Sequence, residues 1–150
     1  MILITGCTGY IGSRLCRHLL INGYKVRGLI RPSERERANS LIDLGLIPYY
    51  GDLADPLSLH EISDDIDLVY HLAGIHSTYS NTYTLYVQGT INLLNSFSNK
   101  PRASIVFTIN ISMDNSLIKN VLNYEFVFPT YNLTILCVNS FRLIRISNFS

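Results

Sequence analysis

The feature that most constrains this chain is a glycine-rich stretch near its start. Gly6, Gly9 and Gly12 follow one another at G-x-x-G-x-x-G spacing, directly after the apolar run of residues 2–4. Glycine permits a tight turn and close approach of a ligand to the backbone, because it has no Cβ. A strand, a glycine turn and a helix together suit a diphosphate, which the unpaired N–H groups and the positive end of the helix dipole attract. The start of the chain therefore predicts a phosphate-binding turn.

The residues after the glycine turn complete a β-α-β unit. Apolar residues at helical spacing predict an amphipathic helix. The residues expected on its apolar face are Ile11, Leu15, Leu19 and Leu20. After the turn at Asn22 and Gly23, residues 25–30 predict a second strand. Three glycines alone also occur in turns that bind nothing, but a β-α-β unit of this length around them favours dinucleotide binding.

The rest of the chain alternates between strands and helices as far as about residue 108. Strands are expected at residues 47–50, 66–72 and 103–108, with helices over residues 33–44 and 79–97. Ser33 is expected to cap the first of these helices, and Asp55 before Pro56 caps a further short helix. This alternation implies an α/β fold with helices on both faces of a parallel sheet. Right-handed crossovers then predict a Rossmann-type doubly wound sheet of order 3-2-1-4-5, which is C-terminally incomplete.

Composition limits the classes of partner. The 150 residues carry a net charge of +1, and only 15% are charged, which argues against nucleic acid or a membrane surface as partner. The three cysteines, Cys7, Cys16 and Cys137, have no disulfide or metal spacing and are interpreted as buried thiols in a reducing compartment. The first strand begins at Met1, which leaves no room for a secretory signal. These features predict a cytoplasmic protein without a metal site.

Three polar residues at strand ends each allow two interpretations. No acid closes the second strand, and Arg31 at its end suits a 2′-phosphate, which favours NADP over NAD; it is otherwise a solvated arginine in a charged loop. Asp52 is either an acceptor for the adenine amino group or a plain turn former. His71 is either a base or a hydrogen-bonded histidine at a buried strand end, and the second is favoured because no nucleophile lies nearby in the sequence.

Four stretches together resemble a known family. They are residues 5–12 (TGCTGYIG), 51–53 (GDL), 71–74 (HLAG) and 87–94 (VQGTINLL). In this order and spacing the chain resembles the N-terminal half of an extended or atypical short-chain dehydrogenase/reductase of the NAD(P)-dependent epimerase/dehydratase group. The resemblance extends over residues 1 to about 95.

The resemblance implies a set of cofactor-binding residues. Gly6, Gly9 and Gly12 shape the phosphate turn, and the backbone N–H groups that follow bind the pyrophosphate. Arg31 faces the adenosine ribose or its phosphate, Asp52 and Leu53 flank the adenine, and the residues after the fourth strand line the path to the nicotinamide. The full implied set is Gly6, Thr8, Gly9, Tyr10, Ile11, Gly12, Arg31, Asp52, Leu53, Leu72, Ala73 and Gly74. The cofactor is NADP or NAD, and a homodimer is compatible with the resemblance.

The catalytic residues of the family are missing from the sequence. Its chemistry depends on a serine or threonine after the fifth strand and on a Tyr-x-x-x-Lys pair, whose tyrosine acts as acid and base. Asn110 aligns with the serine, Ser112 is a displaced substitute at best, and no Tyr-x-x-x-Lys occurs. Tyr86 also replaces a family asparagine. No catalytic residue is therefore assigned.

Three functions remain open at this point. The first is an oxidoreductase domain that transfers hydride to or from a sugar nucleotide or other small hydroxy or keto substrate, and that is inactive as this chain stands. The second is a non-catalytic NAD(P)-binding module. The third is an unstable truncated fragment. Cofactor binding without turnover distinguishes the second from an active enzyme.

The composition changes near the end of the fifth strand. All nine glycines lie at or before Gly89, and Ala103 is the last alanine. We interpret residues 1–110 as an NAD(P)-binding domain and residues 111–150 as an atypical tail, which a frameshift or premature end would explain. The alternative is a divergent tail that forms extra strands, and residues 125–128 and 133–138 have that character. Reading the other frames of the gene for a Tyr-x-x-x-Lys pair tests the frameshift.

Overall fold

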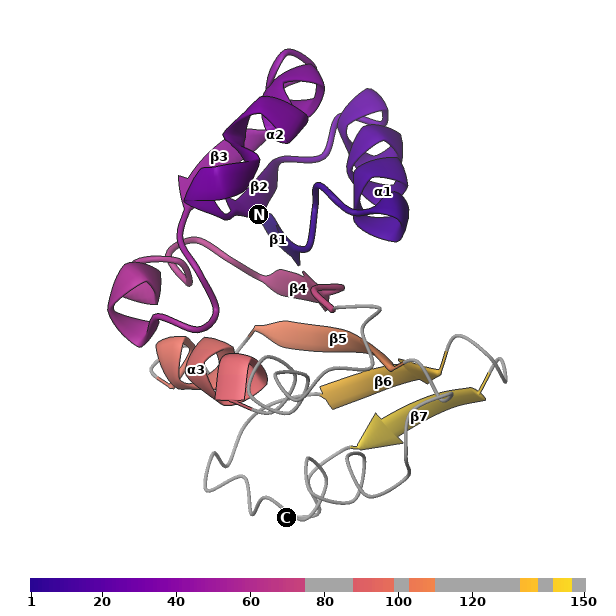
Figure 1. Cartoon of the computed structure of the whole chain (residues 1–150). Coiled ribbons are helices and arrows are strands. Elements are labelled where there is room, and N and C mark those ends of the chain that lie inside the picture. Colours follow the sequence, from indigo (N-terminus) through magenta and orange to yellow (C-terminus); the bar gives the residue numbers. More distant parts are fainter. Residues whose placement is uncertain (75–87, 99–102, 110–132, 138–141, 147–150) are drawn as a thin grey trace.

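The computed structural model describes residues 1–74, 88–98, 103–109, 133–137 and 142–146 of the chain (Figure 1). Its strands are β1 (Ile2–Thr5), β2 (Val26–Ile30), β3 (Ile47–Tyr50), β4 (Leu68–His71), β5 (Ser104–Ile109), β6 (Leu133–Cys137) and β7 (Arg142–Ile146). Its α-helices are α1 (Tyr10–Ile21), α2 (Arg35–Ile42) and α3 (Gly89–Ser96), and two short 3₁₀ helices are η1 (Pro32–Glu34) and η2 (Pro56–Leu59).

The strands form one sheet in the order β3-β2-β1-β4-β5-β6-β7. The predicted order 3-2-1-4-5 is confirmed, and every pair in that part of the sheet is parallel. Beyond it, β6 pairs in parallel with β5, and β7 runs antiparallel to β6. The strand β6 lies within the β-like run expected at residues 133–138, whereas β7 was not predicted.

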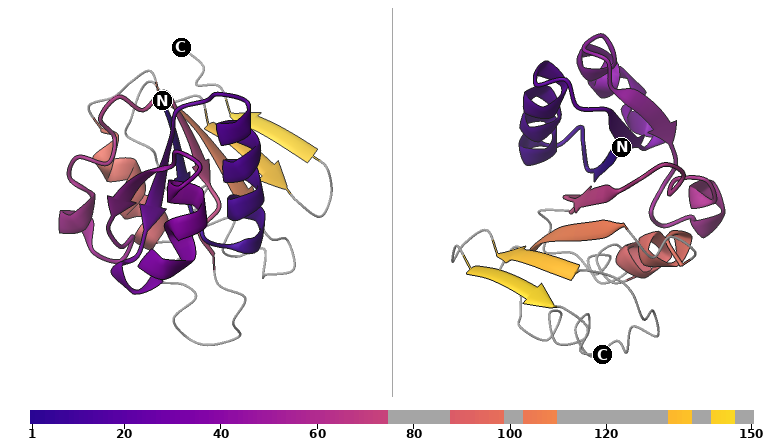
Figure 2. Two further views of the ribbon diagram at one scale, coloured as in Figure 1. Left: turned by 90° about the horizontal axis from the view of Figure 1, so that it is seen from above. Right: turned by 180° about the vertical axis from the view of Figure 1, so that it is seen from behind.

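The sheet separates two hydrophobic clusters, because successive side chains of a strand point to opposite faces. In β1, Leu3 packs into one cluster and Ile4 into the other. The helices α1 and α2 cover the face of Ile4, while α3 and η2 cover the face of Leu3 (Figures 1 and 2). This is the doubly wound arrangement. Strand β1 lies in the middle of the sheet, and three of its four residues are fully buried.

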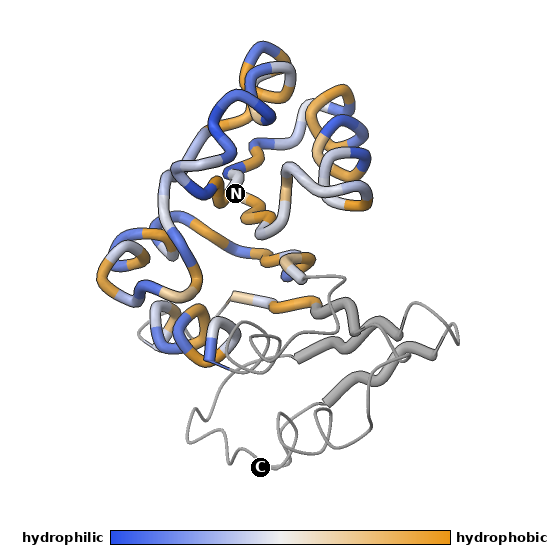
Figure 3. The backbone as a smooth tube through the Cα atoms, viewed as in Figure 1, coloured by the Kyte–Doolittle hydropathy of each residue, from blue (hydrophilic) through white to orange (hydrophobic). Residues whose placement is uncertain are grey.

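The apolar face of α1 differs from the expected one by one residue. Ile11 is 51% exposed, whereas Gly12, Cys16 and Leu19 are buried against the sheet. Each residue turns an α-helix by about 100°, so a face centred on Gly12, Cys16 and Leu19 leaves Ile11 to its side. Hydrophobic and hydrophilic residues alternate along the turns of α1, as Figure 3 shows.

The helix expected over residues 33–44 is divided into two elements. Pro32 begins η1, in which the N–H of Glu34 donates to the carbonyl of Arg31 at 2.8 Å, and α2 begins only at Arg35. The prediction that Ser33 caps this helix is wrong, because the N-cap residue is Glu34, whose side chain makes no capping hydrogen bond. The tight 3₁₀ turn instead brings Glu34 towards the carboxyl edge of the sheet. Of the helix expected over residues 79–97, the structure describes only the part from residue 88 onward.

Asp55 caps η2 as predicted, and this gives a first test of the structure. Its Oδ1 accepts a hydrogen bond from the N–H of Leu57 at 3.1 Å. We expect Asp55→Ala to lower the free energy of unfolding by about 1 kcal/mol, the usual value of such a cap. Asp55→Asn keeps a side-chain acceptor and is expected to lose much less. Urea unfolding of the two variants measures the difference, and equal losses would contradict the capping role.

Candidate functional site

A pocket opens at the carboxyl edge of the sheet, where the segments after β1, β2, β3 and β4 meet. Its lining residues are Gly6, Thr8, Gly9, Leu29, Arg31, Glu34, Asp52, Leu53, Leu72, Ala73 and Gly74. Nine of the twelve residues predicted from the sequence are among them. The other three, Tyr10, Ile11 and Gly12, form the first turn of α1 beside it.

The glycine turn requires glycine at two of its three positions. Gly6 has a φ of +70°, and a Cβ there would lie 2.8 Å from the backbone nitrogen of Ala73. A Cβ on Gly12 would lie 2.1 Å from the carbonyl oxygen of Gly6. The turn is closed by the N–H of Gly9, which donates to the Gly6 carbonyl at 3.0 Å. Any side chain at Gly6 or Gly12 would therefore displace backbone.

The first turn of α1 presents its backbone N–H groups next to this loop. The first hydrogen bond of the helix runs from the N–H of Ser13 to the carbonyl of Gly9 at 2.9 Å. The N–H groups of Tyr10, Ile11 and Gly12 precede it and have no carbonyl four residues back inside the helix. Tyr10 is 75% exposed, and the guanidinium of Arg14 stacks on its ring at 3.7 Å.

The wall formed by the end of β4 is held by a buried hydrogen-bond chain. Thr5 Oγ1 accepts from the N–H of Ala73 at 3.2 Å and lies 2.8 Å from His71 Nδ1. On the other side, His71 Nε2 lies 3.0 Å from Thr90 Oγ1 of α3. Burial lowers the pKa of His71 to about 4, so the ring is neutral at physiological pH. The interpretation of His71 as a hydrogen-bonded histidine at a buried strand end is confirmed.

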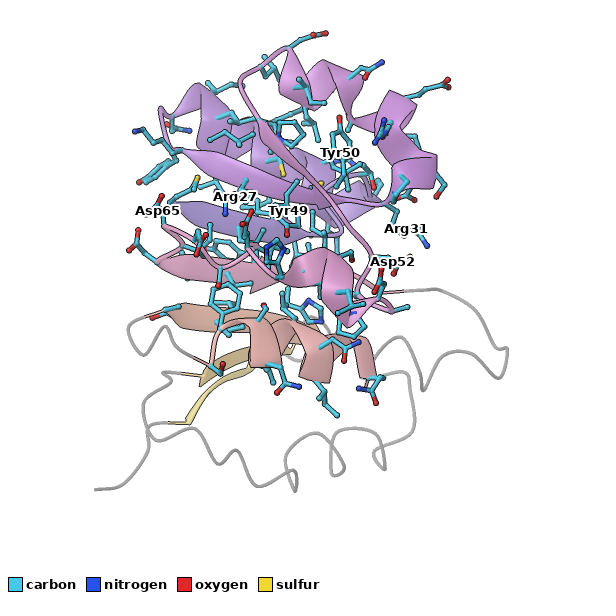
Figure 4. The ribbon with its side chains drawn as sticks, turned by 90° about the vertical axis from the view of Figure 1, so that its left-hand side faces the viewer. Arg27, Arg31, Tyr49, Tyr50, Asp52 and Asp65 are labelled. Carbon is cyan, nitrogen blue, oxygen red and sulfur yellow. The ribbon has the colours of Figure 1, made fainter. Side chains whose placement is uncertain are left out.

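Arg31 and Asp52 lie at the same end of the sheet, opposite the end at which Asp65 lies (Figure 4). Asp52 forms a turn, since its Oδ1 accepts from the N–H of Ala54 at 2.9 Å. Both residues line the pocket.

Leu53 is held in the pocket wall by α3. The Leu53 carbonyl accepts from Asn92 Nδ2 at 2.8 Å, and a Cβ on Gly89 would lie 3.1 Å from Leu53 Cβ. Gly89 thus permits α3 to pack closely across the loop after β3.

Sequence reasoning missed Leu29 and Glu34 as pocket residues. Glu34 lies within the charged run of residues 34–37, but its side chain is only 16% exposed. Its Oε1 accepts from Arg31 at 2.8 Å, and its Oε2 accepts from Thr8 Oγ1 at 2.9 Å. The hydrogen bond from Arg31 is the main reason why the pKa of Glu34 lies below its ordinary value, so the carboxylate is ionised. Pro32, which begins the 3₁₀ turn, was the only signal of this placement in the sequence.

The two cysteines that the structure describes in full are buried in the same hydrophobic cluster as Ile4. Burial raises the pKa of the Cys7 and Cys16 thiols to about 12, so neither is a thiolate at neutral pH. This agrees with their interpretation as inert core residues. Within residues 1–74 and the other described segments, no helix reaches the length and hydropathy needed to cross a bilayer. The positions that bear on catalysis and on the family asparagine, Tyr86, Asn110 and Ser112, lie outside the described residues.

Comparisons with known proteins give the family of this chain. The model of the NAD dependent epimerase/dehydratase family matches residues 2–109. A GDP-mannose 4,6-dehydratase of Sordaria araneosa is 45% identical over 74 residues, which cover 47% of this chain and 14% of the relative. Cinnamoyl-CoA reductase 1 of Oryza sativa subsp. japonica is 32% identical over 113 residues, which cover 72% of this chain and 33% of the relative. The chain thus spans a third or less of the length of these two relatives.

A solved structure shows the same fold. It is that of a UDP-glucose 4-epimerase from Bifidobacterium longum in complex with NAD⁺ and UDP, with a TM-score of 0.72 and 18% identity. The match covers 91% of this chain and 52% of the epimerase. At that identity the likeness shows the fold alone, whereas the family match covers most of the chain. This chain belongs to the NAD dependent epimerase/dehydratase family.

Proposed function

We propose that this chain is the NAD(P)-binding part of an oxidoreductase of the epimerase/dehydratase type. The observation that carries the proposal is the pocket at the carboxyl edge, where the glycine turn, Arg31, Asp52 and the end of β4 meet. Open parallel sheets bind their ligands at this edge. A Cβ at Gly6 or Gly12 would clash with backbone atoms. The turn therefore has no side chain at these two positions, which fits a group that must approach the main chain closely.

The residues of the pocket suggest how a dinucleotide is held. The N–H groups of Tyr10, Ile11 and Gly12 are available to the pyrophosphate, because the N-terminal turn of a helix attracts anions. Arg31, Asp52 and Leu53 surround the adenosine, and Leu72, Ala73 and Gly74 line the path to the nicotinamide. The cofactor, when bound, supplies a ring that accepts or donates hydride. The neutral His71 acts only on the protein, by fixing the backbone of Ala73 through Thr5.

We propose further that the chain as it stands binds a cofactor without turning over a substrate. General acid–base catalysis contributes about 10²–10⁴-fold to enzymatic rates, and the sequence holds no Tyr-x-x-x-Lys pair to supply it. The substrate of an active enzyme of this type would be a sugar nucleotide or other small hydroxy or keto compound. A non-catalytic NAD(P)-binding module is the second candidate, and the missing pair favours it. An unstable fragment is the third.

Titration of the full chain with NADH and with NADPH, followed by nucleotide fluorescence, tests the proposal. We expect saturable binding of at least one of the two, and no conversion of a sugar nucleotide such as UDP-glucose, followed by chromatography, when NAD⁺ or NADP⁺ is supplied with it. Binding of neither dinucleotide by a protein with native circular dichroism would overturn the cofactor assignment. Turnover would overturn the proposed inactivity.

Other features stay proposals of the same kind. These are a domain of residues 1–110 with an atypical tail of residues 111–150, a homodimer, and a place in the cytoplasm; taken alone, Arg31 favours NADP over NAD. Gel filtration of the chain, with and without cofactor, measures its oligomeric state.

A further inference from the structure

The pocket has an electrostatic feature that the sequence pattern at the end of β2 does not reveal. Its charged lining residues are one cation, Arg31, and two anions, Glu34 and Asp52. Arg31 is 48% exposed, whereas Glu34 is largely enclosed at 16%. The only guanidinium among the lining residues therefore shares the pocket with more negative than positive charge.

Glu34 forms an ion pair with the guanidinium of Arg31, which would otherwise be available to a phosphate. Its Oε1 accepts from Arg31 Nη2 at 2.8 Å and from Arg37 Nη1 at 3.4 Å, and Oε2 accepts from Thr8 Oγ1 at 2.9 Å. The carboxylate thus joins the glycine turn to the segment after β2. To bind a 2′-phosphate, Arg31 would have to leave Glu34 or hold both anions at once.

The two cofactors differ in what they offer to this carboxylate. The adenosine ribose of NAD carries a 2′-hydroxyl that can donate a hydrogen bond, and each carboxylate oxygen can accept more than one. NADP carries a phosphate in the same place, which is an acceptor with a charge between about −1.5 and −2. Two anions that approach within hydrogen-bond distance repel each other, and partial enclosure weakens the screening by water.

We propose that Glu34 sets the cofactor preference of this pocket, by accepting from the adenosine ribose and repelling a 2′-phosphate, so that NAD(H) binds more tightly than NADP(H). This inference rests on the proposed function, because it needs the ribose to lie between the glycine turn and Arg31. It opposes the preference for NADP that Arg31 alone suggests. The residue acts three positions after Arg31, from a 3₁₀ turn rather than from the end of the strand.

Binding of NADH and NADPH to the full chain and three variants tests the inference. Glu34→Gln removes the charge and keeps the length of the side chain, and we expect it to raise the NADPH affinity relative to NADH roughly tenfold. Glu34→Asp keeps the charge and is expected to keep the preference for NADH. Glu36→Gln is the matched control, since Glu36 is exposed on α2 and does not line the pocket. Its ratio of NADH affinity to NADPH affinity should equal that of the wild type.

The outcomes separate the two proposals. If neither dinucleotide binds the folded wild-type chain, the proposed function fails, and this inference fails with it. If both bind but the wild type prefers NADPH, or if Glu34→Gln leaves the ratio as it is in Glu36→Gln, only the role of Glu34 is overturned. If Glu34→Gln loses its circular dichroism signal, two other measurements test the role of Glu34. They are the ratio of NADH affinity to NADPH affinity in the wild type and the preference for NADH in Glu34→Asp.

Discussion

Replacing Gly12 with alanine is expected to weaken dinucleotide binding and to destabilise the fold. The added Cβ would lie 2.1 Å from the carbonyl oxygen of Gly6 and 3.0 Å from Cα of Cys7. Both contacts are with backbone, so no change of rotamer relieves them. Overpacking of this kind costs about 1–3 kcal/mol, and more where backbone must move. We expect the free energy of unfolding to fall by about 3 kcal/mol and the affinity to fall at least tenfold, which corresponds to about 1.4 kcal/mol.

A second glycine provides the control for this prediction. Gly23 has a φ of +79° and nothing within 4 Å of a Cβ, so Gly23→Ala introduces backbone strain without a clash. It should lower stability by about 1 kcal/mol and leave cofactor affinity unchanged. Urea unfolding and fluorescence titration of both variants give the two quantities. Near-wild-type stability and affinity in Gly12→Ala would show that the glycine turn is not packed as described.

Acid is expected to destabilise the protein through His71 before the carboxylates contribute. The pKa of His71 is lowered from 6.5 to about 4, because burial disfavours the charged ring. The unfolded chain therefore takes up a proton near pH 6.5, while the folded chain does so only near pH 4. The contribution to stability is complete above pH 6.5 and is lost as the pH falls towards 4. Its full size is about 3 kcal/mol, at about 1.4 kcal/mol per pH unit.

Urea unfolding between pH 7.5 and pH 5 measures this dependence. His71→Gln should flatten it, because glutamine does not titrate, and should lower stability at neutral pH by disturbing the bonds to Thr5 and Thr90. His18→Gln is the matched control, since His18 is exposed on α1. It should keep the wild-type slope. A slope in His71→Gln equal to that of the wild type would contradict the assignment of the acid sensitivity to His71.

The core of the fold could be predicted because its signals are local. The spacing of Gly6, Gly9 and Gly12, the apolar run of β1 and the alternation of strands and helices each act over a few residues. Parallel pairing and the doubly wound order follow from such a pattern with few alternatives. The same holds for Asp55, whose capping bond reaches only two residues along the chain.

Other features depend on contacts between distant segments. The exposure of Ile11 depends on how α1 is rotated against the sheet, and the role of Gly89 depends on its approach to Leu53 in another loop. A histidine at a strand end does not reveal whether Thr5 and Thr90 will bond to it. These features depend on how distant segments pack together, which the order of residues along the chain does not show.

By itself, the sequence determined that this chain has a glycine turn between a buried strand and a helix, and hence where a diphosphate is expected. Only the tertiary structure decided which charges share that pocket. A carboxylate three residues beyond Arg31 was brought against it by a 3₁₀ turn that begins at Pro32, and Thr8 of the glycine turn bonds to the same group. Electrostatic interactions depend on distance in space, so residues 8, 31 and 34 act as one unit that their order in the chain does not reveal.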